Sequence, residues 1–160
     1  MSAEDIVTLP ESPFSTEFDD KMQATKDKVN KAFNFSLEAH QNQKREEGVP
    51  YIIHPVAVAK ILTDLKLDSA TITTGLLHDT IEDTKVTYES VKEEFGEEVA
   101  NLVEGVTKIS ALENKASSDS KAENFRKLIL ATSKDIRVLL VKLADRLHRL
   151  FNLKERFLVL

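Results

Sequence analysis

The stretch GLLHDTIEDT, residues 75–84, places one histidine and three acids where a helix is expected to bury its apolar face. The apolar pair Leu76-Leu77 leads directly into His78 and Asp79, with no loop residue between them. Both polar residues are therefore expected near the core end of a helix. A carboxylate that is buried there needs a hydrogen bond, a cation or a metal to replace its lost hydration. The stretch thus predicts a helix whose end carries a polar site.

Two further acids lie one helical turn beyond this pair. Glu82 follows His78 by four residues and Asp83 follows Asp79 by four, so each acid shares a helix side with its partner. Taken alone, Glu82 and Asp83 are explained as solvated acids at a helix end. Beside an unfilled set of ligands, however, these acids would repel one another, which favours a bound cation. A carboxylate next to a metal-bound water can take its proton or orient it for attack.

The segment KDIRVLLVKLADRLHRLFNL, residues 134–153, is a second helix with a buried acid to explain. On a helical wheel of about 100° per residue, one apolar stripe consists of Ile136, Leu139, Leu140, Leu143, Leu147 and Leu150. The opposite side carries Val138, Val141, Asp145 and His148. A surface helix would be polar throughout on that side, so the valines predict that it is covered as well. The alternative is a solvated Asp145 that pairs with Arg146 or Arg149.

A second histidine, His54, lies at the start of another predicted helix. Pro55 suits the first helical position, because its missing N–H would have no partner there. The combined donor set is His54, His78, Asp79 and Asp145. Two imidazoles and two carboxylates suit a divalent cation such as Mn²⁺, Fe²⁺, Co²⁺ or Zn²⁺. A lone buried histidine is more often a satisfied core residue than a ligand, so this prediction depends on the combination.

The composition narrows the kinds of protein that fit. The 160 residues are a single-domain length, and 41% apolar with 31% charged residues is typical of a globular protein. The absence of cysteine excludes disulfides, thiolate metal sites and cysteine nucleophiles. A net charge of −5 argues against a general nucleic-acid binder, which would show a basic patch. A small anionic ligand is compatible with this charge if a metal or a few basic residues gather locally.

Membrane and export signals are not found in the sequence. No apolar run approaches the roughly 18 residues that a membrane-spanning helix needs. The N-terminal segment MSAEDIVTLPESPFS lacks the basic start and long apolar stretch of a secretion signal. We therefore expect a cytoplasmic protein that does not engage a membrane.

The remaining pattern predicts an all-α fold of about six or seven helices. Four glycines and four prolines are too few for a turn-rich β sandwich, and no alternating strand pattern is found. The expected helices cover residues 17–45, 55–65, 69–84, 88–95, 97–110, 122–132 and 134–153. Ser69 and Thr87 are the expected caps of two of them, and Gly96 is expected to end the fourth. Residues 1–15 are predicted to be an irregular leader, and residues 16–160 to form a single domain.

Four segments together resemble a known enzyme family: YIIHPVAVAKIL (51–62), GLLHDTIEDT (75–84), FGEEVANLVEGVTKIS (95–110) and KAENFRKLILATSKDIRVLLVKLADRLH (121–148). In this order they resemble the hydrolase domain of the RelA/SpoT alarmone enzymes, in the His-Asp (HD) metal phosphohydrolase superfamily. The resemblance covers roughly residues 20–153. It implies an HD-domain helical bundle that holds one Mn²⁺. It also implies an enzyme that removes pyrophosphate from the 3′ position of ppGpp or pppGpp, the guanosine tetra- and pentaphosphates, to give GDP or GTP.

The resemblance also implies roles for individual residues. The metal ligands would be His54, His78, Asp79 and Asp145. Glu82 and Asp83 match the family's Glu-Asp catalytic pair, which would activate and orient the water. Arg45 matches a basic residue that contacts the nucleotide. Lys142 and Arg146 fall in the matched segment KLADRLH and are expected to help bind phosphates.

Two segments depart from the family pattern. After Arg45 the family usually continues with Lys-Ser, whereas this chain has Glu46-Glu47. After ADRLH the family usually has Asn and then Met-Arg-Thr, whereas residues 149–152 here are Arg-Leu-Phe-Asn. Acids beside an anionic substrate should weaken its binding through like-charge repulsion. The metal ligands are therefore expected to be intact, while the nucleotide-binding wall is altered.

These departures leave three functions open. The first is a Mn²⁺-dependent ppGpp 3′-pyrophosphohydrolase, the second an HD phosphohydrolase for another nucleotide, and the third an alarmone-binding module with little turnover. No synthetase domain is expected within these residues, so a chain of this extent would degrade or bind the alarmone without making it. The final segment ERFLVL, residues 155–160, is compatible with a packing tail, a homo-oligomer contact or a domain that lacks its neighbour.

Overall fold

The computed structural model describes residues 16–44, 48–114 and 121–158, and within them it is built from helices. The helices are α1 (Thr16–Ala39), α2 (Ile53–Asp64), α3 (Ser69–Leu77), α4 (Thr80–Asp83), α5 (Tyr88–Phe95), α6 (Glu97–Asn114), α7 (Lys121–Ser133) and α8 (Ile136–Leu158). The described residues contain no strand beyond an isolated bridge between Lys44 and Pro50. The all-α prediction is confirmed: seven of these helices have eight or more residues, and α4 is a single turn.

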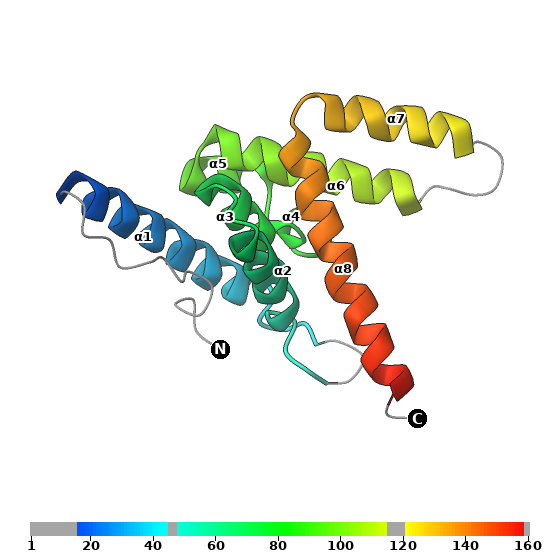
Figure 1. Ribbon diagram of the computed structural model, residues 1–160, viewed down its shortest axis with the longest axis horizontal. Helices are drawn as coiled ribbons and strands as arrows, with labels where there is room; N and C mark the ends of the chain where they lie inside the picture. The colour runs from blue at the N-terminus through cyan, green and yellow to red at the C-terminus, as the bar shows by residue number, and fades with distance from the viewer. Residues whose placement is uncertain (1–15, 45–47, 115–120, 159–160) are drawn as a thin grey trace.

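Helices α2 and α3 form the centre of the bundle. They pack against each other, and α8, which begins beside α6, packs against both of them (Figure 1). Helix α1 lies against α3 on the other side, while α7 packs on α6 and α8. All residues of α3 from Ala70 to Leu77 are buried, as expected for a central helix that is apolar around most of its circumference. The three helices that carry the predicted ligands therefore meet at the core.

The predicted helix over residues 69–84 is two helices, and its predicted cap is wrong. The cap is Asp68, whose carboxylate accepts a hydrogen bond from the Thr71 amide, rather than Ser69. The helix breaks at His78-Asp79 because side chains bind the backbone carbonyls of its last turn. The His78 ring donates from Nδ1 to the Gly75 carbonyl at 2.7 Å. The Thr80 hydroxyl donates to the Leu77 carbonyl, also at 2.7 Å.

The buried side of α8 is not the side that carries its leucine stripe. Val138, Val141 and Asp145 are buried, which confirms that this side is covered. The leucine stripe is the more exposed side, and Leu150 reaches 62% exposure. The small residues of the buried side let α8 approach its neighbours closely. A Cβ atom added at Gly105 of α6 would lie only 2.9 Å from Val138 Cγ2.

The other predicted helix boundaries are mostly reproduced. Thr87 caps α5 in a reciprocal pair of hydrogen bonds with Ser90, and Gly96 ends the same helix with φ of 91°. Helix α1 ends at Ala39 rather than at residue 45, and His40–Gln43 form turns instead. The predicted leader, residues 1–15, lies outside the described residues, so the division into a leader and one domain stays a prediction.

Within the described ranges, no helix has the length and apolar character needed to cross a bilayer. The expected cytoplasmic location and the three alternatives for residues 155–160 stay predictions.

Arg137 joins the first turn of α8 to two other parts of the bundle. Its Nη1 group contacts Asp68 at 2.7 Å and Glu98 at 2.8 Å, and its Nη2 group contacts Asp135 at 2.6 Å. Partial burial of Asp68 opposes ionisation, but hydrogen bonds from Thr71 and Arg137 outweigh it and lower the pKa of this carboxyl. Asp68 caps α3, so this cluster ties α8 to the helix that carries His78.

The close approach of α2 and α3 at Gly75 is testable. A Cβ atom at Gly75 would lie 2.7 Å from Leu62 Cδ1, and Leu62 is fully buried. Gly75→Ala should therefore lower the free energy of unfolding by about 1–3 kcal/mol. In a Leu62→Val background, which removes the obstructing methyl, the same change should be neutral or stabilising, because Ala favours a helix over Gly by roughly 1 kcal/mol. Urea unfolding of the wild type, the two single variants and the double variant measures the coupling between Gly75 and Leu62. If Gly75→Ala changes the free energy of unfolding equally in both backgrounds, the predicted contact does not cause the effect.

A second prediction concerns the acid dependence of the Arg137 cluster. Arg137→Gln should lower the free energy of unfolding by about 1–2 kcal/mol at pH 7. The folded-state pKa of Asp68 and of Asp135 lies below the ordinary value of 3.8. The stability that the ionised Asp68 and Asp135 carboxylates give the folded protein is therefore complete above pH 3.8. It is lost as the pH falls through the lower folded-state pKa. Urea unfolding should show that the difference in the free energy of unfolding between wild type and Arg137→Gln is smaller at pH 3 than at pH 7. The control Arg126→Gln, at an exposed position, should change the free energy of unfolding little at either pH. If Arg137→Gln lowers the free energy of unfolding equally at pH 7 and pH 3, this account is wrong.

Candidate metal centre

The structure brings the four predicted ligands together from four elements. His54 lies in the first turn of α2, His78 ends α3, Asp79 begins α4 and Asp145 lies on α8. Ligand atoms of His54, His78 and Asp145 all lie within 4.8 Å of one another. The Asp79 Oδ2 atom is 3.0 Å from His78 Nε2 and 3.8 Å from His54 Nε2. The four side chains are buried, so they form a compact polar centre inside the helical core.

A divalent cation fits this centre, because a buried nitrogen there lacks a hydrogen-bond partner. His78 uses Nδ1–H for the Gly75 carbonyl, which leaves the lone pair of the neutral ring on Nε2. That Nε2 atom is fully buried and makes no hydrogen bond, although Asp79 Oδ2 and Asp145 Oδ1 lie 3.0 and 3.6 Å away. A lone pair flanked by carboxylate oxygens is the arrangement that a metal ion requires. His54, His78 and Asp145 therefore form a group that can hold a metal ion.

The two carboxyl groups of the centre are held in the ionised form. Burial opposes ionisation of Asp79 and Asp145, but the adjacent histidines outweigh it and hold the pKa of each carboxyl well below its usual range. Burial lowers the pKa of His54. For His78 the neighbouring carboxylates outweigh complete burial and raise the pKa to about 10, so a metal ion that uses Nε2 as a ligand displaces a proton there. The two ionised carboxylates attract cations, and in the structure Lys142 and Arg149 approach them.

Two residues that sequence reasoning did not assign orient the ligands. The Tyr51 hydroxyl donates to Asp79 Oδ2 at 2.6 Å, and its oxygen lies 3.2 Å from Asp83 Oδ2. The His148 ring approaches His54, with 2.7 Å between the two Nδ1 atoms. In the structure His54 Nε2 donates to Asp145 Oδ1 at 2.8 Å, so its Nδ1 accepts from His148. A metal ion at the centre would require the other tautomer, in which Nδ1 donates to His148 and the Nε2 lone pair faces the ion. Spacing was the available signal, because Tyr51 precedes His54 by three residues and His148 follows Asp145 by three.

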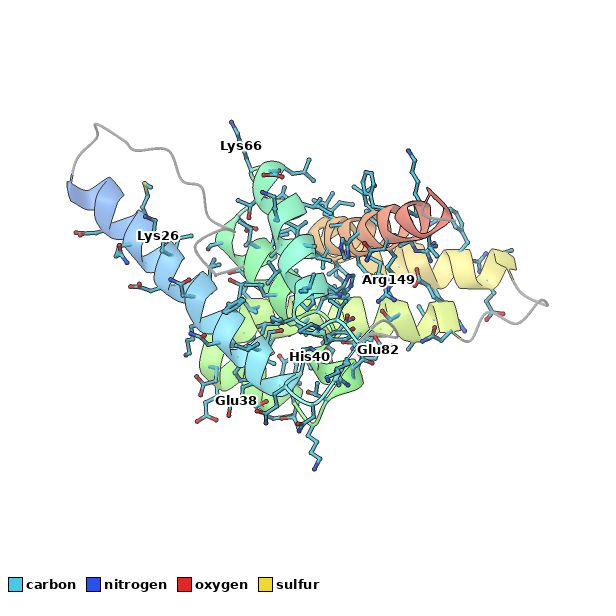
Figure 2. All side chains as sticks on the ribbon, turned by 90° about the horizontal axis from the view of Figure 1, so that it is seen from below. Lys26, Glu38, His40, Lys66, Glu82 and Arg149 are labelled. Atoms are coloured by element: carbon cyan, nitrogen blue, oxygen red, sulfur yellow. The ribbon has the colours of Figure 1, made fainter. Side chains whose placement is uncertain are left out.

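A cavity of about 520 Å³ opens beside the centre. Its wall includes Asp79 and Asp145 from the centre, and the predicted catalytic acids Glu82 and Asp83 at its edge. Both catalytic candidates are exposed, as expected for acids at a helix end, yet they lie at the mouth of this cavity. Glu82 of α4 and Arg149 of α8, both labelled in Figure 2, line this cavity. The pKa of Glu82 is raised by its partial burial and by the nearby charges of Asp83 and Asp79.

The predicted phosphate-binding residues also line this cavity. Lys142 Nζ donates to the Ser110 hydroxyl at 2.8 Å and lies 3.3 Å from Asp145 Oδ2. Arg146 Nη2 contacts Glu113 Oε1 at 2.6 Å. Arg45, the predicted nucleotide contact, lies outside the described residues, together with the departure at Glu46-Glu47. The roles of all these residues in catalysis and binding stay predictions.

Comparison with known proteins gives the context of this geometry. The family model described as "HD domain" matches residues 32–157. A GTP pyrophosphokinase of Myxococcus xanthus is 55% identical over 130 residues, which are 79% of this chain and 17% of that protein. A guanosine-3′,5′-bis(diphosphate) 3′-pyrophosphohydrolase of Aquifex aeolicus is 54% identical over 127 residues, 79% of this chain and 18% of that protein. The chain thus spans less than a fifth of the length of these two relatives.

A solved structure shows the same arrangement of helices. It is described as "a metazoan ortholog of SpoT" that "hydrolyzes ppGpp and plays a role in starvation responses". It superimposes with a TM-score of 0.60 at 27% identity, covering 90% of this chain and 74% of that one. The resemblance to the RelA/SpoT hydrolase domain is thereby confirmed. The chain belongs to the HD-domain family, and within it to the RelA/SpoT type.

Proposed function

We propose that this domain is a Mn²⁺-dependent guanosine-3′,5′-bis(diphosphate) 3′-pyrophosphohydrolase. It converts ppGpp or pppGpp to GDP or GTP and releases pyrophosphate. The observation that carries the proposal is the meeting of His54, His78, Asp79 and Asp145 beside a cavity lined with basic residues. The name of the Aquifex aeolicus relative and the description of the metazoan structure support this activity. The Myxococcus xanthus relative is named GTP pyrophosphokinase, which describes transfer of pyrophosphate to GTP and not its hydrolytic removal, so the geometry of the site carries the choice of hydrolysis.

The four buried side chains would hold one divalent ion. Mixed imidazole and carboxylate ligands without thiolates suit Mn²⁺ among the divalent metals. When bound, the ion lowers the pKa of a coordinated water and offsets negative charge on the phosphorus group that is attacked. Tyr51 and His148 keep Asp79 and His54 in place for this purpose.

Glu82 and Asp83 would act on the attacking water. The raised pKa of Glu82 makes this carboxylate a better proton acceptor near neutral pH than an ordinary glutamate. Asp83 lies beside the Tyr51 hydroxyl, which fixes its position relative to Asp79. We propose that Glu82 takes the proton of the water and that Asp83 orients it.

The basic residues of the cavity would bind the anionic substrate. Lys142 is held by Ser110 and Asp145 on the side of the centre, and Arg146 lies one turn further along α8. Both are cations on the same wall as the catalytic acids. Cations placed beside the oxygens of the attacked diphosphate offset the negative charge that develops as water adds to phosphorus and the bond to the ribose 3′ oxygen breaks.

The proposal is tested by incubating the Mn²⁺-loaded protein with ppGpp. GDP and pyrophosphate should appear in equal amounts by ion-exchange chromatography. Glu82→Gln should lower kcat by about 100-fold or more, because general-base catalysis typically contributes that much. Glu89→Gln, which removes an exposed acid of α5 away from the cavity, should leave kcat unchanged. Release of orthophosphate alone, or full activity of Glu82→Gln, would refute the assignment.

The metal requirement is tested independently of turnover. Asp145→Asn removes a charged ligand from a wholly buried position and should weaken Mn²⁺ binding at least about 100-fold in isothermal titration calorimetry. The matched control is Asp64→Asn, which changes an exposed acid at the end of α2 and should bind Mn²⁺ like the wild type. Circular dichroism confirms that each variant is folded. If Asp145→Asn retains wild-type affinity, Asp145 is not a ligand.

A substrate panel separates this activity from the two alternatives that the sequence left open. Faster hydrolysis of a nucleotide without a 3′-diphosphate would identify an HD phosphohydrolase of another specificity. Tight ppGpp binding without products in excess Mn²⁺ would identify a binding module.

A further inference from the structure

Arg149 contacts the two carboxylates of the metal centre. Its Nε group donates to Asp145 Oδ1 at 2.8 Å, and its Nη2 group lies 4.0 Å from Asp79 Oδ2. Asp145 Oδ1 is also the atom that lies 2.8 Å from His54 Nε2. The guanidinium group therefore occupies the carboxylate oxygens that a metal ion would use.

Arg149 is less firmly held than the other cation at the centre. Lys142 also approaches Asp145, but it is anchored by Ser110 and Glu113 and its side chain is only 11% exposed. The Arg149 side chain is 51% exposed and forms part of the wall of the cavity. A long side chain that is half in solvent can turn from the carboxylates toward the cavity without disturbing the core.

The two positions of Arg149 have opposite effects on a metal. Against Asp145 and Asp79, the guanidinium group competes with a divalent ion for the same oxygens and repels it. Turned into the cavity, it can form paired hydrogen bonds with phosphate oxygens, because its planar donors match them. An anion in the cavity therefore favours the position that frees the metal ligands.

We propose that Arg149 couples the metal site to the anion site. It acts as a counter-ion that the metal displaces from Asp145 and Asp79 and that then binds a phosphate group of the substrate. The two ligands consequently bind cooperatively, and each increases the affinity of the centre for the other by the same factor. Arg149 is a specificity residue on this account, because a substrate without an anionic group near the metal does not gain from the coupling. The inference rests on the proposed function for the metal site, but its test needs no turnover.

The test is the binding of Mn²⁺ alone, measured by isothermal titration calorimetry. The proteins are the wild type, Arg149→Gln and Lys154→Gln, each titrated in sodium chloride and in sodium sulfate of equal ionic strength. Sulfate is a tetrahedral dianion that complexes Mn²⁺ only weakly, so it serves as the phosphate probe. Lys154→Gln is the matched control, because it removes the same charge from an exposed position of the same helix that does not line the cavity.

In chloride, Arg149→Gln should bind Mn²⁺ on the order of tenfold more tightly than the wild type, within the usual range of coupling between two sites. Lys154→Gln should bind it within about twofold of the wild type in both salts, because screening by solvent weakens an exposed charge at a distance. Sulfate should tighten Mn²⁺ binding to the wild type severalfold and should leave Arg149→Gln unchanged. If Arg149 merely supported the fold, the opposite change in Mn²⁺ affinity would be expected, because its loss would loosen the ligands and weaken Mn²⁺ binding.

Equal or weaker Mn²⁺ binding by Arg149→Gln would overturn the inference, and so would a sulfate effect that persists in this variant. Neither result touches the proposed hydrolase activity. If none of the three proteins binds Mn²⁺, the metal site itself is wrong and both proposals fail. Hydrolysis of ppGpp by a wild type whose Mn²⁺ affinity does not respond to sulfate would leave the function standing and remove only the coupling.

Discussion

The burial of two ionised carboxylates among packed helices is the constraint on which the rest of the structure depends. Asp79 and Asp145 lose their hydration, so donors and cations must surround them. The rings of His54 and His78 meet this need from two further positions, and Tyr51 supplies a hydroxyl. Because these groups come from separate parts of the chain, the centre forms only when α2, α3 and α8 are packed together.

The end of α3 turns this packing into a site that is open on one side. The His78 and Thr80 side chains bind the carbonyls of the last helical turn, so the chain changes direction at Asp79. The following turn, α4, then carries Glu82 and Asp83 to the mouth of the cavity while the preceding residues stay in the core. One short segment therefore holds two buried residues that are predicted ligands and an exposed pair of acids. This division suits a reaction in which water enters at the edge of a buried metal.

Sequence patterns predicted the ends of helices correctly where residues within one turn determine them. Thr87 and Gly96 mark the ends of α5 because capping depends on residues within one turn. The predictions failed where longer contacts decide. Asp68 rather than Ser69 caps α3, and Asp68 is also held by Arg137, which lies 69 residues further along the chain. The break at His78 was missed because residues 69–84 have an unbroken helical pattern, and side-chain bonds to carbonyls leave no trace in that pattern.

The sequence by itself determined the kind of fold and the chemistry at hand: helices, no cysteine, and two histidines and two acids of the types that bind divalent metals. Only the tertiary structure decided how they meet. His54 and Asp145 are 91 residues apart in the chain and 2.8 Å apart in space, a distance set by the packing of α2 against α8. It also decided that α8 buries its valines and Asp145 rather than most of its leucines, and that Arg149 faces the ligands. The physical reason is that periodicity states which residues share a side of a helix, while the neighbouring helices determine which side is buried.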